Sequence, residues 1–185
     1  MYPFIRLAYQ MWKHRKDAPL GLFDSHESRL MCWPWDIDFW MELNNGRTLT
    51  LYDLGRMPMA SRIGLTRVLL DKKWAMAIVG GSIRYRRRVF MFEKLRMQTR
   101  AVCWDDKFFY TEQSLWKANG ECASHVLLRS AVTDKKGIVR PAEVLQAMGI
   151  EMASPTPPAW IAAWIAAEDH RPWPPMQDIP PEVTP

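Results

Sequence analysis

The chain of 185 residues lacks most features that mark specialised protein classes. Its three cysteines, Cys32, Cys103 and Cys122, are widely spaced, which fits neither a disulfide framework nor a Cys-x-x-Cys metal knuckle. The four histidines form no pair at a zinc-ligand spacing, so we expect no metal site. We also expect no cofactor. Free thiols are typical of reducing compartments, so the expected location is cytoplasmic.

The chain also lacks long apolar runs and a strong excess of one charge. No stretch approaches the ~20 apolar residues of a membrane-spanning helix. Lys and Arg number 25 against 20 Asp and Glu, and the formal net charge of +5 does not by itself indicate nucleic acid. Hydrophobic residues make up 48%, which excludes collagen-like, mucin-like and fully disordered classes and allows one compact domain with extensions.

The first segment, residues 1–28, joins an apolar run to a basic cluster. Arg6 and Gln10 interrupt the run, and the cluster at 13–16 follows it, whereas a signal peptide places its charges first. We therefore expect an N-terminal amphipathic helix that is docked on the domain. A short interfacial helix that contacts lipid is the less favoured alternative.

The central region, residues 29–150, begins with a β-rich run at 29–35 and continues with a helix. Asn44 or Asn45 can serve as the N-cap of that helix. Proline lacks an amide hydrogen, so Pro58 is expected to end or kink it.

Hydrophobic residues then alternate with polar ones, which predicts strands over 82–89 and 94–103. Asn119-Gly120 predicts a tight hairpin between the next two strands. The last segment, residues 151–185, is proline-rich and holds one short helical stretch. The order of one strand, a long helix and about four antiparallel strands predicts an α+β protein in which a curved sheet embraces the helix.

Three short motifs lie between the first strand and the middle of the long helix. They read Asp36-Ile-Asp38, Asn44-Asn45-Gly46 and Asp53-Leu-Gly-Arg56. Their order and spacing resemble the hotdog-fold acyl-CoA thioesterases, and most of all the 4-hydroxybenzoyl-CoA thioesterase-like branch. The resemblance implies a hotdog fold, in which a curved antiparallel sheet wraps a long central helix. It also implies a homodimer or higher homo-oligomer, because the sites of this family form between subunits.

The resemblance further implies hydrolysis of an acyl-CoA or related acyl thioester. That reaction needs a carboxylate beside the carbonyl carbon and a donor for the developing oxyanion. Asp38 is the matching carboxylate, as a nucleophile or as the base for a water molecule. The backbone N–H of Asn45 or Gly46 is the matching donor, because a helix start has unpaired amides and a positive dipole end. Alternatively, Asp36 and Asp38 are ordinary turn carboxylates.

The remaining candidates for substrate contact at the helix entry are Asp36, Glu42, Asn44 and Asp53. Glu42 stands where the branch usually carries a histidine, and Thr48 stands where it usually carries an aromatic residue. These departures support a second hypothesis, a hotdog protein that binds acyl thioesters or lipids without turnover. Asp53 and Arg56, three residues apart on one helix, are expected to form a structural ion pair.

A run of basic residues follows the helical region. We expect Arg84, Arg86, Arg88, Lys94, Arg96 and Arg100 to share one face of two paired strands. Arg84 and Arg86 are candidates to contact the phosphates of CoA. The alternative is a solvated outer face. Tyr85 alternates onto the other face, so the stripe lacks the interleaved aromatic residues of a nucleic-acid surface, and no nucleic-acid partner is expected.

Overall fold

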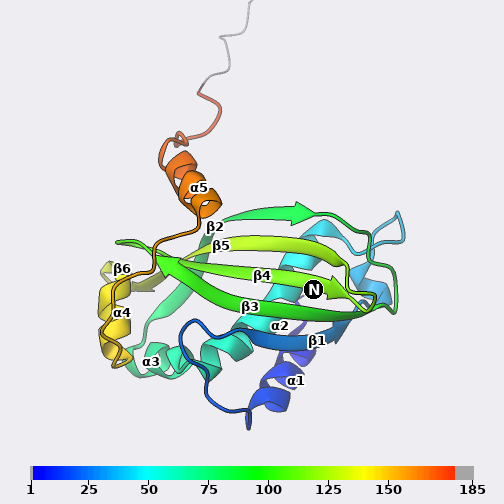
Figure 1. Cartoon of the computed structure of the whole chain (residues 1–185), viewed down its shortest axis with the longest axis horizontal. Coiled ribbons are helices and arrows are strands. Elements are labelled where there is room, and N and C mark those ends of the chain that lie inside the picture. The colour runs from blue at the N-terminus through cyan, green and yellow to red at the C-terminus, as the bar shows by residue number, and fades with distance from the viewer. Residues whose placement is uncertain (1, 178–185) are drawn as a thin grey trace, which may run out of the picture. The chain divides into compact units, whose positions relative to one another are not determined.

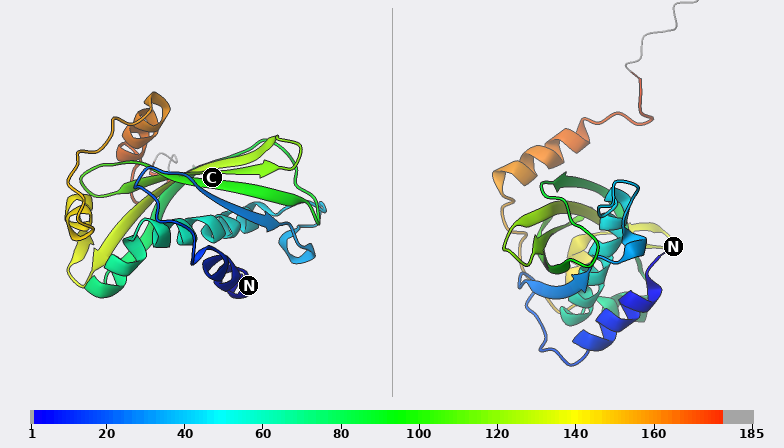
Figure 2. Two further views of the ribbon diagram at one scale, coloured as in Figure 1. Left: turned by 60° about the horizontal axis from the view of Figure 1, so that its bottom comes forward. Right: turned by 90° about the vertical axis from the view of Figure 1, so that its right-hand side faces the viewer.

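The computed structural model describes residues 2–177 (Figure 1). The chain divides into two compact units, with the boundary between Pro155 and Thr156. In the larger unit, an antiparallel sheet curls around helix α2 (Asn45–Arg62) (Figure 2). This architecture confirms the predicted hotdog fold. The strands are β1 (His26–Met31), β2 (Ala75–Tyr85), β3 (Lys94–Trp104), β4 (Phe109–Lys117), β5 (Cys122–Asp134) and β6 (Gly137–Val139). Their order is β1-β3-β4-β5-β2, and β6 pairs with β5.

Shorter helices complete both units. In the larger unit these are α1 (Phe4–His14), the 3₁₀ turn η1 (Pro34–Asp36), α3 (Leu65–Lys72) and α4 (Pro141–Ala147). The smaller unit contains α5 (Ala159–Asp169). Residues 178–185 of the predicted proline-rich segment lie outside the described part of the chain. Across residues 2–177, none of the helices combines the length and the apolar character that a membrane crossing requires.

Helix α2 begins where the sequence indicates. The Asn44 side chain accepts a hydrogen bond from the Arg47 N–H at 3.0 Å, which satisfies one of the unpaired amides of the first turn. One side of the helix then buries Leu51, Tyr52 and Leu54 against the concave face of the sheet. This contact forms the main core of the larger unit, and removing such area from water is its main source of stability.

Of the two outcomes expected of Pro58, an end to α2 is wrong. Helix α2 continues through Pro58 to Arg62. A proline cannot donate to the carbonyl four residues before it, here that of Leu54. The Ser28 hydroxyl on β1 donates to this carbonyl at 3.3 Å, so the lost helical hydrogen bond is replaced across the core.

The predicted basic stripe on two paired strands is also wrong. Strand β2 pairs with β5, and β3 pairs with β1 and β4, so β2 and β3 are not neighbours. Arg84 therefore lies on the far strand from Arg96 and Arg100, and Arg86 and Arg88 follow the end of β2. The alternation of residues predicted strand structure but held no information on which strands pair.

Gly55 allows α2 to approach the sheet closely. A Cβ atom at this position would lie 2.6 Å from the Met97 sulfur and 2.8 Å from the Thr99 hydroxyl oxygen, both on β3. At Gly46, in the first turn of the same helix, the nearest atom would lie 3.4 Å away. The two glycines therefore have different physical roles within one helix.

We predict that Gly55→Ala destabilises the protein although alanine favours helices. The methyl group overpacks the interface between helix and sheet, so the free energy of unfolding should fall by about 1–3 kcal/mol. Gly46→Ala is the matched control and should leave the free energy of unfolding equal or higher. Urea denaturation measures both variants, and equal stability of the two would show that Gly55 does not limit the approach.

Candidate functional site

Asp38 lies in a tight loop that leads into α2. The loop is closed by a bridge between Ile37 and Leu43 and by a hydrogen bond of 2.8 Å from the Asp38 N–H to the Glu42 carbonyl. One carboxylate oxygen of Asp38 accepts from the Trp40 N–H at 2.9 Å. The carboxylate is half-buried and keeps its second oxygen for other contacts.

The first turn of α2 offers two amide donors. The Arg47 N–H is taken by the Asn44 side chain and the Thr48 N–H by the Asn44 carbonyl. Within residues 2–177, the N–H groups of Asn45 and Gly46 have no protein acceptor. They are the first two amides of the helix, so their dipoles favour a negative charge at this point.

A cavity of about 230 Å³ lies at this helix start. The predicted residues Glu42, Asn45 and Arg86 line it together with Tyr85 and Ser124. The Tyr85 hydroxyl donates to the Asn45 carbonyl at 2.9 Å, and burial raises the pKa of Tyr85. This contact joins the end of β2 to the first residue of α2.

Tyr52 of α2 is buried and contacts Ser124, which lines this cavity. Its hydroxyl lies 2.9 Å from the Ser124 hydroxyl, and burial raises the pKa of Tyr52 far above its usual range. The sequence analysis missed Tyr52, Tyr85 and Ser124. Tyr52 lies on α2 itself, whereas the pairing of β2 with β5 places Tyr85 opposite Ser124, and no local spacing indicates that pairing.

Glu42 is held by an arginine from the segment after β2. The distance from Arg88 Nε to a Glu42 carboxylate oxygen is 3.0 Å, and Arg88 is largely exposed. Arg86 lines the cavity, whereas Arg84 is exposed on β2 and lies outside its lining. Of the two predicted phosphate contacts, the structure therefore places only Arg86 beside the helix start.

Asp36 is fully buried, in contrast to Asp38. One carboxylate oxygen accepts from Arg6 at 2.6 Å and from the Trp33 N–H at 3.0 Å, and the other accepts from Arg47 at 2.7 Å. The carbonyl of Asp36 accepts the N–H of Asn44 at 2.9 Å. The geometry thus gives Asp36 a structural role, because it connects α1, the loop and α2.

The Asp53 carboxylate likewise has its partners within the protein. It forms an ion pair with Arg56 and accepts a hydrogen bond of 2.9 Å from the Tyr2 hydroxyl. Arg56 also donates to Gln113 on β4 at 3.2 Å. The structure therefore places Asp53 and Asn44 in the framework of α2. Glu42, Asn45 and Arg86 line the cavity at its start, whereas Asp38 and Gly46 lie outside that lining.

No group of His, Cys, Asp and Glu side chains within residues 2–177 is arranged to hold a metal ion. The three cysteines are free thiols, and burial raises the pKa of Cys32 and Cys103 to about 11. A protonated buried thiol is a poor nucleophile. Burial therefore argues against Cys32 and Cys103 as nucleophiles.

Comparison with known proteins identifies the family and the fold of this chain. The sequence pattern of the thioesterase-like superfamily matches residues 32–165. The chain belongs to this superfamily. It is similar to protein THEM6 of Xenopus laevis, with 32% identity over 169 residues that cover 90% of this chain and 80% of that protein.

Solved structures show the same fold. The probable thioesterase YbaW of Escherichia coli matches with a TM-score of 0.57 and 18% identity over 66% of this chain and 98% of that chain. The DHNA-CoA thioesterase of Staphylococcus aureus matches with a TM-score of 0.58 and 14% identity over 78% of this chain and 91% of that chain. The thioesterase-like superfamily member described here therefore has the hotdog fold of both.

We predict that Asp36→Asn destabilises the fold. The substitution leaves Arg6 and Arg47 without their buried counter-charge, and breaking a buried pair in this way costs about 3 kcal/mol or more. Asp106→Asn changes an exposed carboxylate in the β3–β4 turn and is the matched control. Urea denaturation at neutral pH measures both. An unchanged midpoint for Asp36→Asn would show that the network does not stabilise the fold.

Proposed function

We propose that this protein hydrolyses acyl thioesters, with acyl-CoA as the substrate class, at the start of α2. The observation that carries the proposal is the pair of unpaired amides at Asn45 and Gly46, which lie beside the loop that holds Asp38. Membership of the thioesterase-like superfamily supports this reaction class. The CoA thioester named for the Staphylococcus aureus protein supports the substrate class.

The amides of Asn45 and Gly46 are suited to the thioester carbonyl. As the tetrahedral intermediate forms, the carbonyl oxygen gains negative charge, and preorganised N–H donors stabilise it. Gly46 is exposed and has no side chain, so a substrate can approach the backbone closely there. The carbon–sulfur bond then breaks, and the thiolate leaves.

Asp38 supplies the carboxylate in this proposal. Its loop fixes one oxygen through the Trp40 N–H, which orients the second oxygen without neutralising the charge. As a base, the carboxylate takes a proton from the water that attacks the carbonyl carbon. As a nucleophile, it attacks that carbon itself and forms a mixed anhydride, which water then hydrolyses to the acid. Glu42, across the same loop, is paired with Arg88 and is assigned no proton transfer.

Arg86 and its neighbours suit the anionic part of the substrate. The rim of the cavity is formed by the run of Arg86, Arg87 and Arg88. Arg87 pairs with Glu121 and Arg88 pairs with Glu42, whereas Arg86 forms no ion pair with any residue in the range 2–177. We therefore assign Arg86 to a phosphate of CoA, because guanidinium groups bind phosphate with two parallel hydrogen bonds.

The second candidate function is binding of acyl thioesters without turnover. The observation that favours it is that both carboxylates of the loop already have partners within the protein. Asp38 accepts a hydrogen bond from the Trp40 N–H, and Glu42 forms an ion pair with Arg88. The same cavity and the same amides would then hold the thioester but leave water unactivated.

The two amides and the Asp38 loop lie near an open edge of the sheet. Strand β2 is the last strand in the order, and its residues are mostly exposed. The opposite edge strand, β1, is covered in part by α1, whose Arg6 and Gln10 bond to its carbonyls. We propose that two chains pair along β2, because pairing satisfies an unpaired edge and brings a partner next to the segment after Tyr85.

We predict that Asp38→Asn lowers kcat for acyl-CoA hydrolysis by at least about 100-fold. The amide oxygen can still accept from the Trp40 N–H, so the loop and the melting temperature should be preserved. Thiol release measures turnover, with Glu42→Gln as the matched control in the same loop. Wild-type turnover in Asp38→Asn, or an equal loss in Glu42→Gln, would remove Asp38 from the assigned role.

We also predict a homodimer of about 43 kDa in light scattering at micromolar concentration, twice the chain mass of 21.6 kDa. Val79→Lys places a charge on the exposed bulge of β2 and should yield monomers. Leu70→Lys makes the same kind of change on exposed α3 and should remain dimeric. A monomeric wild-type protein that is active would contradict the paired-edge arrangement.

A further inference from the structure

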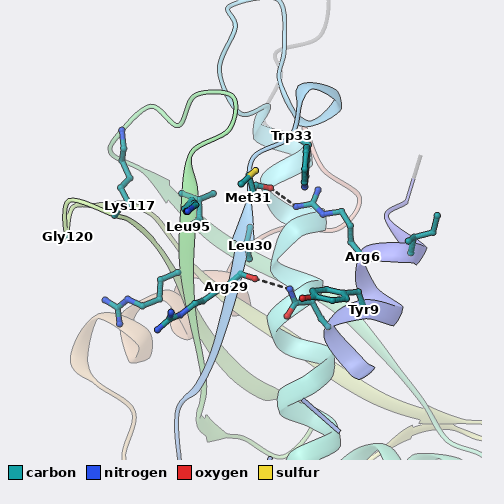
Figure 3. A pocket seen from close by; sticks show the side chains of 14 residues that line it. Arg6, Tyr9, Arg29, Leu30, Met31, Trp33, Leu95, Lys117 and Gly120 are labelled. Atoms are coloured by element: carbon teal, nitrogen blue, oxygen red, sulfur yellow. Dashed lines mark hydrogen bonds between the residues drawn. The ribbon is translucent and has the colours of Figure 1, made fainter. Parts of the chain in front are cut away.

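Two polar residues of helix α1, Arg6 and Gln10, face the protein. Arg6 bonds to Asp36 and, at 2.9 Å, to the Met31 carbonyl, and Gln10 bonds to the Arg29 carbonyl at 3.0 Å (Figure 3). Gln10 is buried. These polar contacts with the edge strand β1 and with the loop fix the rotation of the helix about its axis.

Leu7 of α1 packs against the core, but the opposite face of the helix is also apolar and is exposed. This α1 outer face consists of Phe4, Ile5, Ala8, Tyr9 and Trp12. Phe4 is 71% exposed, Ile5 is 87% exposed and Trp12 is 59% exposed. A surface helix of a globular protein normally carries charged and polar residues on the face opposite the core. Contact with an apolar partner would therefore remove the α1 outer face from water.

Basic residues border the α1 outer face at its C-terminal end. The exposed residues Lys13, Arg15 and Lys16 follow Trp12, and no acidic residue occurs before Asp17. The Arg15 guanidinium lies 4.4 Å from the centre of the Trp12 ring. An apolar face with tryptophan and tyrosine beside a basic cluster is the pattern of helices that lie in the headgroup region of anionic membranes.

The same apolar surface continues along the sheet edge. A cavity of about 880 Å³ runs between α1 and β1, and Ile5, Tyr9 and Trp33 contribute to its lining (Figure 3). Trp33 stacks on Trp35 with a ring separation of 5.3 Å. The basic residues of the lining are Arg6, Arg29, Lys94, Arg96 and Lys117, and the lining includes no acidic residue. Apolar and cationic groups thus occur together beyond the helix itself.

We propose that the α1 outer face binds the surface of a lipid bilayer that contains anionic phospholipid. The apolar side chains enter the boundary between headgroups and acyl chains, and Lys13, Arg15 and Lys16 contact the phosphates. Charge complementarity favours this occupant over a second copy of the chain, because an anionic bilayer supplies counter-charges for Lys13, Arg15 and Lys16, whereas residues 2–16 of a second copy contain no acidic residue to pair with them. The inference is independent of the proposed thioester hydrolysis.

Flotation of the full chain with lipid vesicles tests the proposal. One set of vesicles contains phosphatidylcholine alone. In the other set, about one third of the phosphatidylcholine is replaced by phosphatidylglycerol. The wild-type chain should float with the anionic vesicles, and added salt should release it because screening weakens contacts with the headgroups. The double variant Ile5→Ser/Trp12→Ser should bind the anionic vesicles at least about tenfold more weakly. The variant Lys13→Ser/Lys16→Ser should lose binding to a similar extent.

Matched control variants distinguish binding through the α1 outer face from non-specific adsorption to vesicles. Leu70→Ser removes an exposed apolar residue from α3, and Lys135→Ser/Lys136→Ser removes two exposed charges from the β5–β6 turn. Both should bind like wild type, and all variants should keep the wild-type melting temperature, because the substituted side chains are exposed. Failure of the wild-type chain to bind anionic vesicles, or equal losses in the controls, would overturn the proposal. A smaller particle in light scattering for Ile5→Ser/Trp12→Ser would overturn it too, since the face would then contact a second copy.

Discussion

The buried carboxylate of Asp36 is the contact on which the arrangement of the N-terminal half depends. It accepts hydrogen bonds from Arg6 of α1, from Arg47 in the first turn of α2 and from the Trp33 amide. Its backbone carbonyl accepts the amide of Asn44, the N-cap of α2. One residue thus fixes the rotation of α1, the start of α2 and the path of the loop between them. The exposed apolar face of α1 and the position of Asp38 both follow from this network.

For the two aspartates of the Asp36-Ile-Asp38 motif, the sequence predicts their place in the chain but not their separate roles. The motif itself indicates a carboxylate near the helix start, and Asn44 is the cap that its residue type predicts. The difference between the buried Asp36 and the half-buried Asp38 depends on Arg6, which is 30 residues away in the chain. Local spacing contains no information on such a contact, so the sequence alone could not separate their roles.

The fold was predictable where local rules decide the structure. The Asn119-Gly120 hairpin joins β4 to β5 as expected, and the order of helix and strands predicts the class. The other features of the fold depend on contacts between residues far apart in the chain. Ser28 replaces the hydrogen bond that Pro58 cannot make, and the pairing of β2 with β5 moves Arg84 away from Arg96. Both depend on contacts across the sheet, which no periodicity along the chain specifies.

Thiol release from a panel of acyl-CoAs by the purified wild-type chain tests whether this protein hydrolyses thioesters. We expect multiple turnovers with at least one member of the panel, together with a higher melting temperature in its presence. A melting temperature that rises with acyl-CoA while no thiol is released over hours would contradict hydrolysis and establish binding alone.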